Sequence, residues 1–220
     1  MQRVRRLRAI VAIAAVGVLA VAGLAGCRSE PNVAAYVGDT RFTEKQINEV
    51  VDEVADRVNE GRLGGVRQNV VSWLVLGDLG RRVAAEQQVS IPPVDVVGAA
   101  EQAQLPADTK LAKAFAEWVT VGTALLQVAP DSQPSQADLR AIFESLVDQG
   151  QVPEGTTFEM VASQLITPDT AKLVGLRNLL SEAAEQHKLA VNPRYRPLNV
   201  ALGDIPFPLA LEASAVSDVR

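Results

Sequence analysis

The sequence predicts a mainly α-helical fold with short extended segments near both ends of the folded domain. Three observations support this prediction. Between residues 43 and 187, apolar residues recur at spacings of three and four, the period of an amphipathic helix. Several of these stretches open with a capping residue, as at Thr43 and Ser135. Residues 33–42 and 188–196 lack this period and are typical of extended chain.

The elements follow in order from local signals. Residues 33–42 form two short extended pieces around a turn at Gly38-Asp39. Thr43 and Gln46 form a capping box that opens the first helix. Glycines, prolines and further capping residues, with Asp108 as the expected cap of the third long helix, separate the later helices. The predicted helices cover residues 43–58, 66–87, 93–104, 109–129, 135–150, 158–165 and 167–187.

The first 26 residues have the composition of a secretion signal. Four arginines and no acidic residue precede residue 9, and the 17 residues from 9 to 25 carry no charge. A basic start followed by an apolar stretch is the layout of a signal peptide. A permanent membrane helix is the alternative, but 17 residues rich in alanine and glycine are short and weakly apolar for a span.

The residues before the only cysteine decide between these alternatives. Leu24, Ala25 and Gly26, followed by Cys27, resemble the bacterial lipobox, where the lipoprotein signal peptidase cleaves and the thiol carries a diacylglycerol. We therefore expect residues 1–26 to be a lipoprotein signal peptide, Cys27 to be lipidated and residues 27–32 to be a short tether. Acyl chains on Cys27 then hold the domain at the outer face of the cell membrane.

Composition excludes several classes of function. One cysteine and one histidine are too few for a Cys₂His₂ or Cys₄ zinc site, an intramolecular disulfide or a CxxC redox pair. Without residues 1–26 the chain keeps 17 basic and 26 acidic residues, a net charge of about −9. Such an acidic domain lacks the basic patch that releases counterions from nucleic acid. We expect no nucleic-acid partner, no metal and no cofactor.

The sequence offers no catalytic constellation, so we expect the protein not to be an enzyme. His187 falls in the last turn of a predicted helix, where a cationic side chain suits the helix dipole; a lone acid–base role is the alternative. The acidic pairs Asp52/Asp56 and Glu49/Glu53 lie on the polar face of one helix, which favours solvent contact over glycoside chemistry. Residues 61–65 are predicted to link two helices, because no GxxxxGK[ST] phosphate-binding pattern is present.

The order of these parts resembles the chaperone domain of SurA-type and PrsA-type foldases. The stretch GDTRFTEKQINEVVDEV (38–54) resembles their opening turn, strand and first helix, and RQNVVSWLVLGDLGRRVAAEQQVSI (67–91) resembles their second helix. The stretch EAAEQHKLAVNPRYR (182–196) is similar to their closing helix and strand. Its last part, VNPRYR, is similar in particular to small actinobacterial lipoproteins of this group.

The resemblance implies a SurA/PrsA-like helical domain over residues 33–197, in which the N- and C-terminal extended segments pair in a small sheet. One departure matters for function. The two-domain foldases carry a parvulin prolyl-isomerase domain before the last helix, whereas here residues 148–168 are too few and lack histidine. Prolyl isomerase activity is therefore not expected. Residues 198–220 have no period, and we expect a loosely ordered C-terminal tail.

The resemblance implies a chaperone, or holdase, for unfolded, secreted or envelope proteins, and the lipobox at Cys27 implies that it is membrane-anchored and extracytoplasmic. The alternative is an adaptor or structural lipoprotein that binds one dedicated envelope partner. A holdase must keep large apolar side chains accessible to its clients. The candidate groove residues are Trp73, Phe115 and Trp118, which lie on the apolar faces of two predicted helices. Simple core packing is the alternative for each of them.

Overall fold

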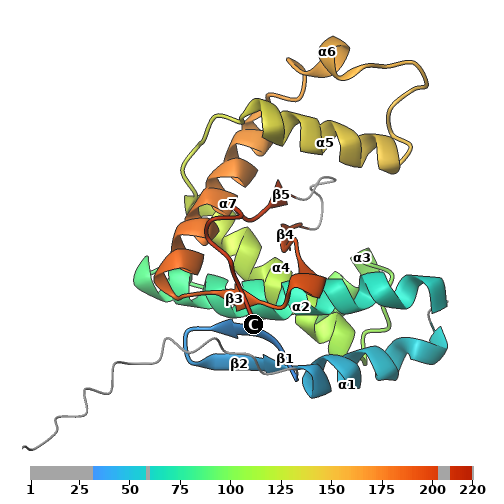
Figure 1. Cartoon of the computed structure of the whole chain (residues 1–220), viewed down its shortest axis with the longest axis vertical. Helices are drawn as coiled ribbons and strands as arrows, with labels where there is room; N and C mark the ends of the chain where they lie inside the picture. Colours follow the sequence, from blue (N-terminus) through green and yellow to red (C-terminus); the bar gives the residue numbers. More distant parts are fainter. Residues whose placement is uncertain (1–31, 58–59, 203–208, 220) are drawn as a thin grey trace, which may run out of the picture.

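The computed structural model describes residues 32–57, 60–202 and 209–219. The predicted signal peptide and lipobox, with Cys27, lie outside the described residues. The fold is mainly α-helical with a small sheet from N- and C-terminal strands, as the sequence predicted (Figure 1). The helices are α1 (Glu44–Val54), α2 (Glu60–Glu86), α3 (Val96–Gln102), α4 (Lys110–Val128), α5 (Gln136–Asp148), α6 (Phe158–Val161) and α7 (Pro168–Gln186), with short 3₁₀ turns at Ala55–Arg57 and Pro193–Tyr195.

The terminal sheet joins the two ends of the domain. Strands β1 (Val33–Val37) and β2 (Thr40–Thr43) form a hairpin whose turn uses Gly38 at φ 56°, a left-handed conformation that favours glycine. On its other edge β1 pairs antiparallel with β3 (Ala190–Val191). Strand β6 (Ser217–Asp218) adds to β3 in parallel, so the strand order is β2-β1-β3-β6. The pairing of the two extended ends is therefore confirmed.

Local capping signals place the starts of several helices as predicted. The Thr43 hydroxyl accepts a hydrogen bond from the Gln46 backbone N–H at 3.2 Å, and the Gln46 side chain accepts one from the Thr43 backbone N–H at 2.8 Å. Ser135 opens α5 in the same reciprocal way with Asp138. These hydrogen bonds satisfy backbone donors that the first turn of a helix leaves without a partner.

Three helix starts differ from the prediction. Helix α3 begins at Val96, three residues after the predicted start, with Asp95 as its cap. Helix α2 begins at Glu60, so residues 61–65 are helical rather than a linker. Glycine costs roughly 1 kcal/mol per residue in a helix, and tertiary packing of the rest of α2 outweighs that cost. Helix α4 is capped by Thr109, whose hydroxyl accepts from the Ala112 N–H at 3.1 Å, instead of by Asp108.

The core lies where α2 crosses α4. Gly80 of α2 brings the two helices close together, because a Cβ placed on it would lie 2.6 Å from a Val121 methyl group of α4. Helix α1 and the sheet cover one side of α2, and α7 packs against both α2 and α4. The largest fully buried side chains are Trp118, Ile47, Leu76, Leu79, Leu125, Leu139, Ile142, Leu173, Leu176, Leu180, Leu189 and Leu209.

The C-terminal segment is packed, which corrects the prediction of a loosely ordered tail for its described residues. Strands β4 (Asn199–Val200) and β5 (Leu209–Ala210) pair with each other, and β6 completes the main sheet. The buried apolar residues of this segment follow neither a helical nor a strand period. A search for periodic apolar residues therefore does not detect them. The buried ones are Leu198, Val200, Leu202, Leu209, Leu211, Ala215, Val216 and Val219.

The 3₁₀ turn in the VNPRYR stretch ties the closing segment to α1. Asn192 caps this turn, and the Tyr195 hydroxyl donates a hydrogen bond to Glu44 Oε2 at 2.6 Å. Arg194 forms an ion pair with the same carboxylate. Burial, followed by the hydrogen bond to Glu44, raises the pKa of Tyr195 above its ordinary value. The residues that carry the family resemblance therefore have a structural role in joining the two ends of the chain.

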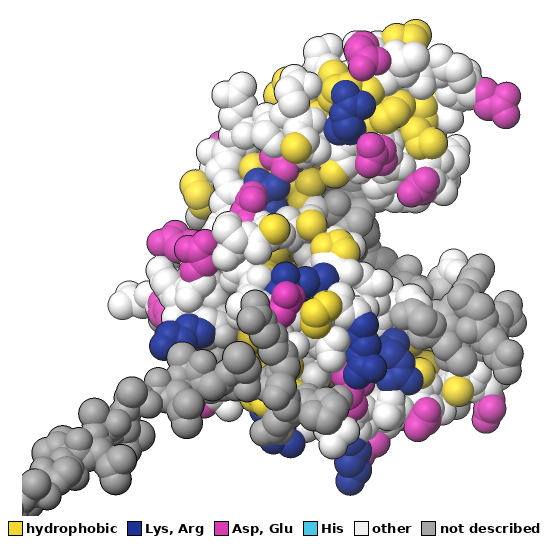
Figure 2. Space-filling model, viewed as in Figure 1, with side chains coloured by type: hydrophobic (Ala, Val, Ile, Leu, Met, Phe, Trp, Pro, Cys, Tyr) yellow, Lys and Arg dark blue, Asp and Glu magenta, His cyan; other side chains and the backbone are white. Residues whose placement is uncertain are grey.

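The molecule has a lower body and an upper part (Figure 1). The sheet, α1, α2, α3 and α4 make the body at one end of the long axis, and α7 rises from it toward α5 and α6 at the other end. The surface is hollowed on one side between the upper part and the body (Figure 2). In the portion of the chain that the structure describes, no helix combines the length and apolar character needed to span a bilayer.

Candidate functional site

Two of the three predicted groove residues contact each other. Trp73 of α2 and Phe115 of α4 meet edge to face, with ring centroids 5.0 Å apart and an interplanar angle of 64°. Both side chains are half-buried. Their mutual contact uses part of the apolar surface that each ring would offer to a client, and the rest stays accessible to solvent.

The third predicted groove residue belongs to the core. Trp118 is fully buried, and its indole N–H donates a hydrogen bond to the Ala201 carbonyl at 2.6 Å. A Cβ on Gly122, one turn along α4, would lie 2.3 Å from a Leu202 methyl group, so the C-terminal segment covers this face of the helix. The assignment of Trp118 to an accessible groove was wrong, because a segment expected to be loose is packed over it.

The exposed large apolar residues of the described chain fall into two groups. Val94 lies in the segment that leads into α3, Val97 lies in α3 and Val128 ends α4, whereas the rest belong to the α5–α6 region. Sequence reasoning missed both groups because it searched for aromatic residues on helical stripes. The second group consists of Val147 (46% exposed), Ile166 (52%) and Met160 (64%).

Val128 of the first group lines a groove between α4 and residues 89–95, and Val94 lies between two of its lining residues, Pro93 and Asp95. This groove has a volume of about 520 Å³ and a mainly apolar lining that includes Val89, Pro92, Pro93, Val119, Ala124 and Val128. Asp95 is its only charged lining residue, and the Asp95 carboxylate accepts the Gly98 backbone N–H at 2.9 Å as the cap of α3. We call this feature the α4 groove. It suits a neutral apolar ligand of small cross-section.

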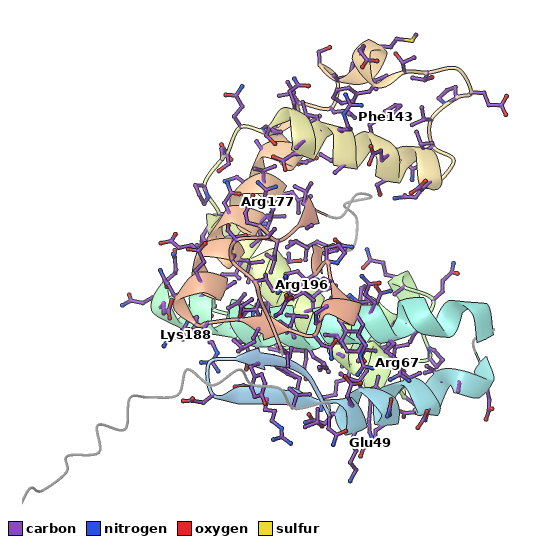
Figure 3. The ribbon with its side chains drawn as sticks, viewed as in Figure 1. Glu49, Arg67, Phe143, Arg177, Lys188 and Arg196 are labelled. Carbon is purple, nitrogen blue, oxygen red and sulfur yellow. The ribbon has the colours of Figure 1, made fainter. Side chains whose placement is uncertain are left out.

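The second group belongs to residues 136–166, which we call the arm: α5, a loop, α6 and the segment that leads to α7. Phe143 lies on the side of α5 that faces α6 (Figure 3), where its ring meets that of Phe158 at a centroid distance of 5.9 Å. The Arg140 guanidinium lies 4.4 Å above the Phe158 ring. These contacts join α5 and α6 but leave apolar side chains facing solvent, which gather over the upper part of the molecule (Figure 2).

A buried ion pair holds the base of the arm. Arg177 of α7, which points toward this junction in Figure 3, pairs with Asp138 in the first turn of α5. The second guanidinium nitrogen of Arg177 lies 3.2 Å from a Glu212 carboxylate oxygen in the C-terminal segment. Burial by itself would raise the pKa of Asp138, but the hydrogen bonds from Ser135 and Arg177 outweigh it and lower that pKa below its ordinary value. This junction thus joins three segments that are distant in sequence: the start of α5, helix α7 and the C-terminal segment.

Acidic side chains surround the apolar surface of the arm, as the magenta groups of the upper part in Figure 2 indicate. Glu144, Asp148, Glu154 and Glu159 are all exposed. Hydrogen bonds from its own backbone and from the Thr157 side chain lower the pKa of Glu159, so its carboxylate is ionised at neutral pH. The arm therefore combines accessible apolar side chains with negative charge.

His187, Glu49 and Glu53, which the sequence offered as possible acid–base groups, make structural contacts. His187 ends α7 as its C-terminal cap, and its Nε2 atom lies 3.0 Å from Glu86 Oε1. Glu49 forms an ion pair with Lys110 at 3.6 Å, and Glu53 accepts the Lys110 backbone N–H at 3.0 Å. Within the described ranges, no group of three or more His, Cys, Asp and Glu side chains is placed to hold a metal ion.

Comparisons with known proteins assign no family to this chain. No protein-family model, no curated protein and no solved structure matches it. The resemblance to the SurA-type and PrsA-type foldases stays a prediction from the residues quoted above.

Proposed function

We propose that this protein is a membrane-anchored extracytoplasmic holdase for unfolded secreted or envelope proteins, without prolyl isomerase activity. The observation that carries the proposal is the presence of two separate accessible apolar surfaces, the arm and the α4 groove, on one small domain. Apolar contact is the main interaction that a holdase can offer to an unfolded chain of any sequence. Two contact points on one molecule also favour capture of a flexible segment that reaches both.

The anchor and the arm would face opposite directions. Asn32 is five residues after Cys27, and five extended residues span about 18 Å at most. Strand β1, which follows Asn32, lies at the lower end of the molecule, and the arm lies at the upper end (Figure 1). With Cys27 acylated, the body would therefore lie near the membrane and the arm would project toward emerging chains.

Aggregation assays test the holdase proposal directly. The full chain in nanodiscs of zwitterionic lipid is expected to delay light scattering by several unrelated proteins that are diluted from denaturant. Replacing Met160 and Ile166 by serine should weaken this suppression, and so should replacing Val94 and Val128 by serine. Substitutions at exposed positions usually change stability by about 0.5 kcal/mol or less, so unfolding by urea should be nearly unchanged in both double variants.

The results separate the proposed function from its rival. Suppression for several unrelated clients, weakened by both double variants, supports the holdase. Failure to suppress any aggregation, together with one dominant partner in crosslinked co-purification from intact cells, would instead identify an adaptor lipoprotein.

Mass spectrometry of the membrane fraction tests the anchor. We expect a mature N-terminus at Cys27 that carries acyl chains, and Cys27→Ser should block processing by the lipoprotein peptidase. An unmodified Cys27, or a mature chain that still begins at Met1, would remove the anchor from the proposal.

A further inference from the structure

We propose that the arm selects client segments in which apolar residues are accompanied by lysine or arginine. This inference rests on the holdase function and specifies the chemistry of the client at one of its two surfaces.

The arm has a strongly unbalanced charge. Residues 136–166 contain five acidic residues and a single basic residue, Arg140. Asp138 is neutralised at the base of the arm by Arg177 of α7. The exposed surface therefore keeps four carboxylates, Glu144, Asp148, Glu154 and Glu159, against one guanidinium.

Arg140 offsets only the charge of Glu159. Its guanidinium already lies over the Phe158 ring, and its Nη2 atom is 4.0 Å from the Glu159 carboxylate. A lysine or arginine of a client that binds beside the arm would lie near the remaining carboxylates rather than near this guanidinium. An acidic client would still meet the like charges of Glu144, Asp148 and Glu154, which discriminates against it.

The apolar and acidic groups of the arm occupy the same short elements. Phe143, Glu144, Val147 and Asp148 fall within two turns of α5, while Glu159 and Met160 are neighbours on α6. A bound segment that buries Val147 or Met160 therefore brings its own side chains beside carboxylates. Lysine and arginine suit this position, because their alkyl stems cover apolar surface while their charged ends reach the carboxylates.

The α4 groove provides an internal contrast. Its only charged lining residue, Asp95, already accepts a backbone N–H of α3. Apolar contact at this groove should therefore be indifferent to the charge of the client. The two surfaces together would hold an apolar segment at the groove and a cationic, apolar segment at the arm.

Peptide binding tests the inference on the full chain in zwitterionic nanodiscs. Three fluorescent peptides would share the same leucine positions and carry Lys, Gln or Glu at all remaining positions, with binding to empty nanodiscs subtracted. Binding of the Lys peptide is expected to be about tenfold tighter than that of the Glu peptide, the effect of a few exposed ion pairs. The preference should decrease as salt rises from about 50 to about 500 mM.

Two matched variants locate the preference. The arm variant replaces Glu144, Glu154 and Glu159 by glutamine and Asp148 by asparagine. It should bind the Gln peptide as the wild type does but lose the preference for lysine. The control variant has the same change in net charge and is expected to keep that preference; it replaces the exposed residues Glu101, Glu182 and Glu185 by glutamine and Asp52 by asparagine.

The remaining outcomes would contradict either the charge inference or the holdase. Equal affinity for the Lys and Glu peptides would overturn the charge inference and leave the holdase intact. Equal loss of preference in both quadruple variants would overturn it as well, because the whole domain rather than the arm would then attract cations. No binding of any peptide would contradict the holdase itself. Dimerisation of the wild type through the arm, abolished by Met160→Ser with Ile166→Ser, would make a second copy the occupant and overturn the inference.

Discussion

Arg177 of α7 and Asp138 of α5 form an ion pair whose side chains are only 10% and 8% exposed. The pair lies where the arm joins the body, and Glu212 of the C-terminal segment contacts the same guanidinium. A polar group in such a place is costly to bury without a partner. The pair therefore couples the orientation of the arm to the packing of α7 and of the C-terminal segment.

Removing the cation should destabilise this junction. Arg177→Met leaves the Asp138 carboxylate buried and unpaired, and breaking a buried pair in this way costs about 3–5 kcal/mol. Urea unfolding monitored by circular dichroism measures the loss. Arg140→Met is the matched control, because its ion pair with Glu159 is exposed and is expected to contribute at most about 1 kcal/mol. Equal effects of the two substitutions would contradict the structural role of Arg177.

The same pair predicts a dependence of stability on pH. The pKa of Asp138 is lower in the folded state than in the unfolded chain, where it is about 3.9. Its contribution to stability is therefore fully present above that value and is lost as the pH falls through the folded-state pKa. The stability difference between wild type and Asp138→Asn should be constant near neutral pH and should decrease below about pH 4. A difference that grows on acidification would show that Asp138 is not held as a carboxylate.

Gly175 allows α7 to approach the loop before α5. A Cβ at this position would lie 1.7 Å from the Pro130 carbonyl oxygen, which belongs to backbone that cannot rotate away. Gly175→Ala should therefore destabilise the domain by about 1–3 kcal/mol, the range for overpacked cores. Gly77→Ala in α2 is the control, since its Cβ would meet only the end of the Arg81 side chain at 4.0 Å. This substitution should be neutral or stabilising by up to about 1 kcal/mol, and thermal melts of both variants test the contrast.

Alanine substitutions should distinguish the buried from the half-buried members of the three predicted client-binding aromatic residues, Trp73, Phe115 and Trp118. Trp118→Ala removes a fully buried indole and leaves the Ala201 carbonyl without its donor, so a loss of about 3–5 kcal/mol is expected. Trp73→Ala and Phe115→Ala remove half-buried rings and should cost less. Unfolding free energy and aggregation suppression would be measured for all three variants. If Trp118→Ala kept full stability, the core position of this residue would be refuted.

Truncation should show that the C-terminal segment belongs to the fold. A chain ending at Ala201 loses Leu202 over α4, strands β5 and β6, and the contact between Arg196 and Asp218 at 3.0 Å. Such a chain should lose cooperative unfolding, whereas removing only Arg220 should change little. Differential scanning calorimetry of the two chains tests this, and a sharp transition near the wild-type temperature for the shorter chain would contradict it.

Hydrogen bonds between near neighbours explain which elements could be predicted. The capping boxes at Thr43 and Ser135 and the turn at Gly38 depend on contacts within three or four residues, so the helix starts and the hairpin were foreseen. The start of α2 was placed too late, because the glycines of 61–65 weaken a helix only modestly while distant packing supports it. The pairing of β1 with β3 was inferred from the family resemblance rather than from any local pattern.

The candidate site was harder to predict than the fold. Trp73, Phe115 and Trp118 occupy similar positions on apolar stripes, and nothing within their helices distinguishes a half-buried ring from a buried one. Trp118 is in the core because Ala201 and Leu202, more than 80 residues later, pack over it. The exposed groups of the arm were missed because Val147, Met160 and Ile166 have no common period.

The sequence by itself determined the helical class and the capped helix starts, because each depends on residues that are adjacent or one helical turn apart. The lipobox at Cys27 depends on adjacent residues as well and stays a prediction. The tertiary structure alone decided which apolar residues stay accessible, since burial depends on what covers a side chain from elsewhere in the chain. It also brought Asp138, Arg177 and Glu212 together from three segments and left the carboxylates of the arm around exposed apolar groups. Long-range packing, which has no sequence period, thus set the surface on which the proposed function rests.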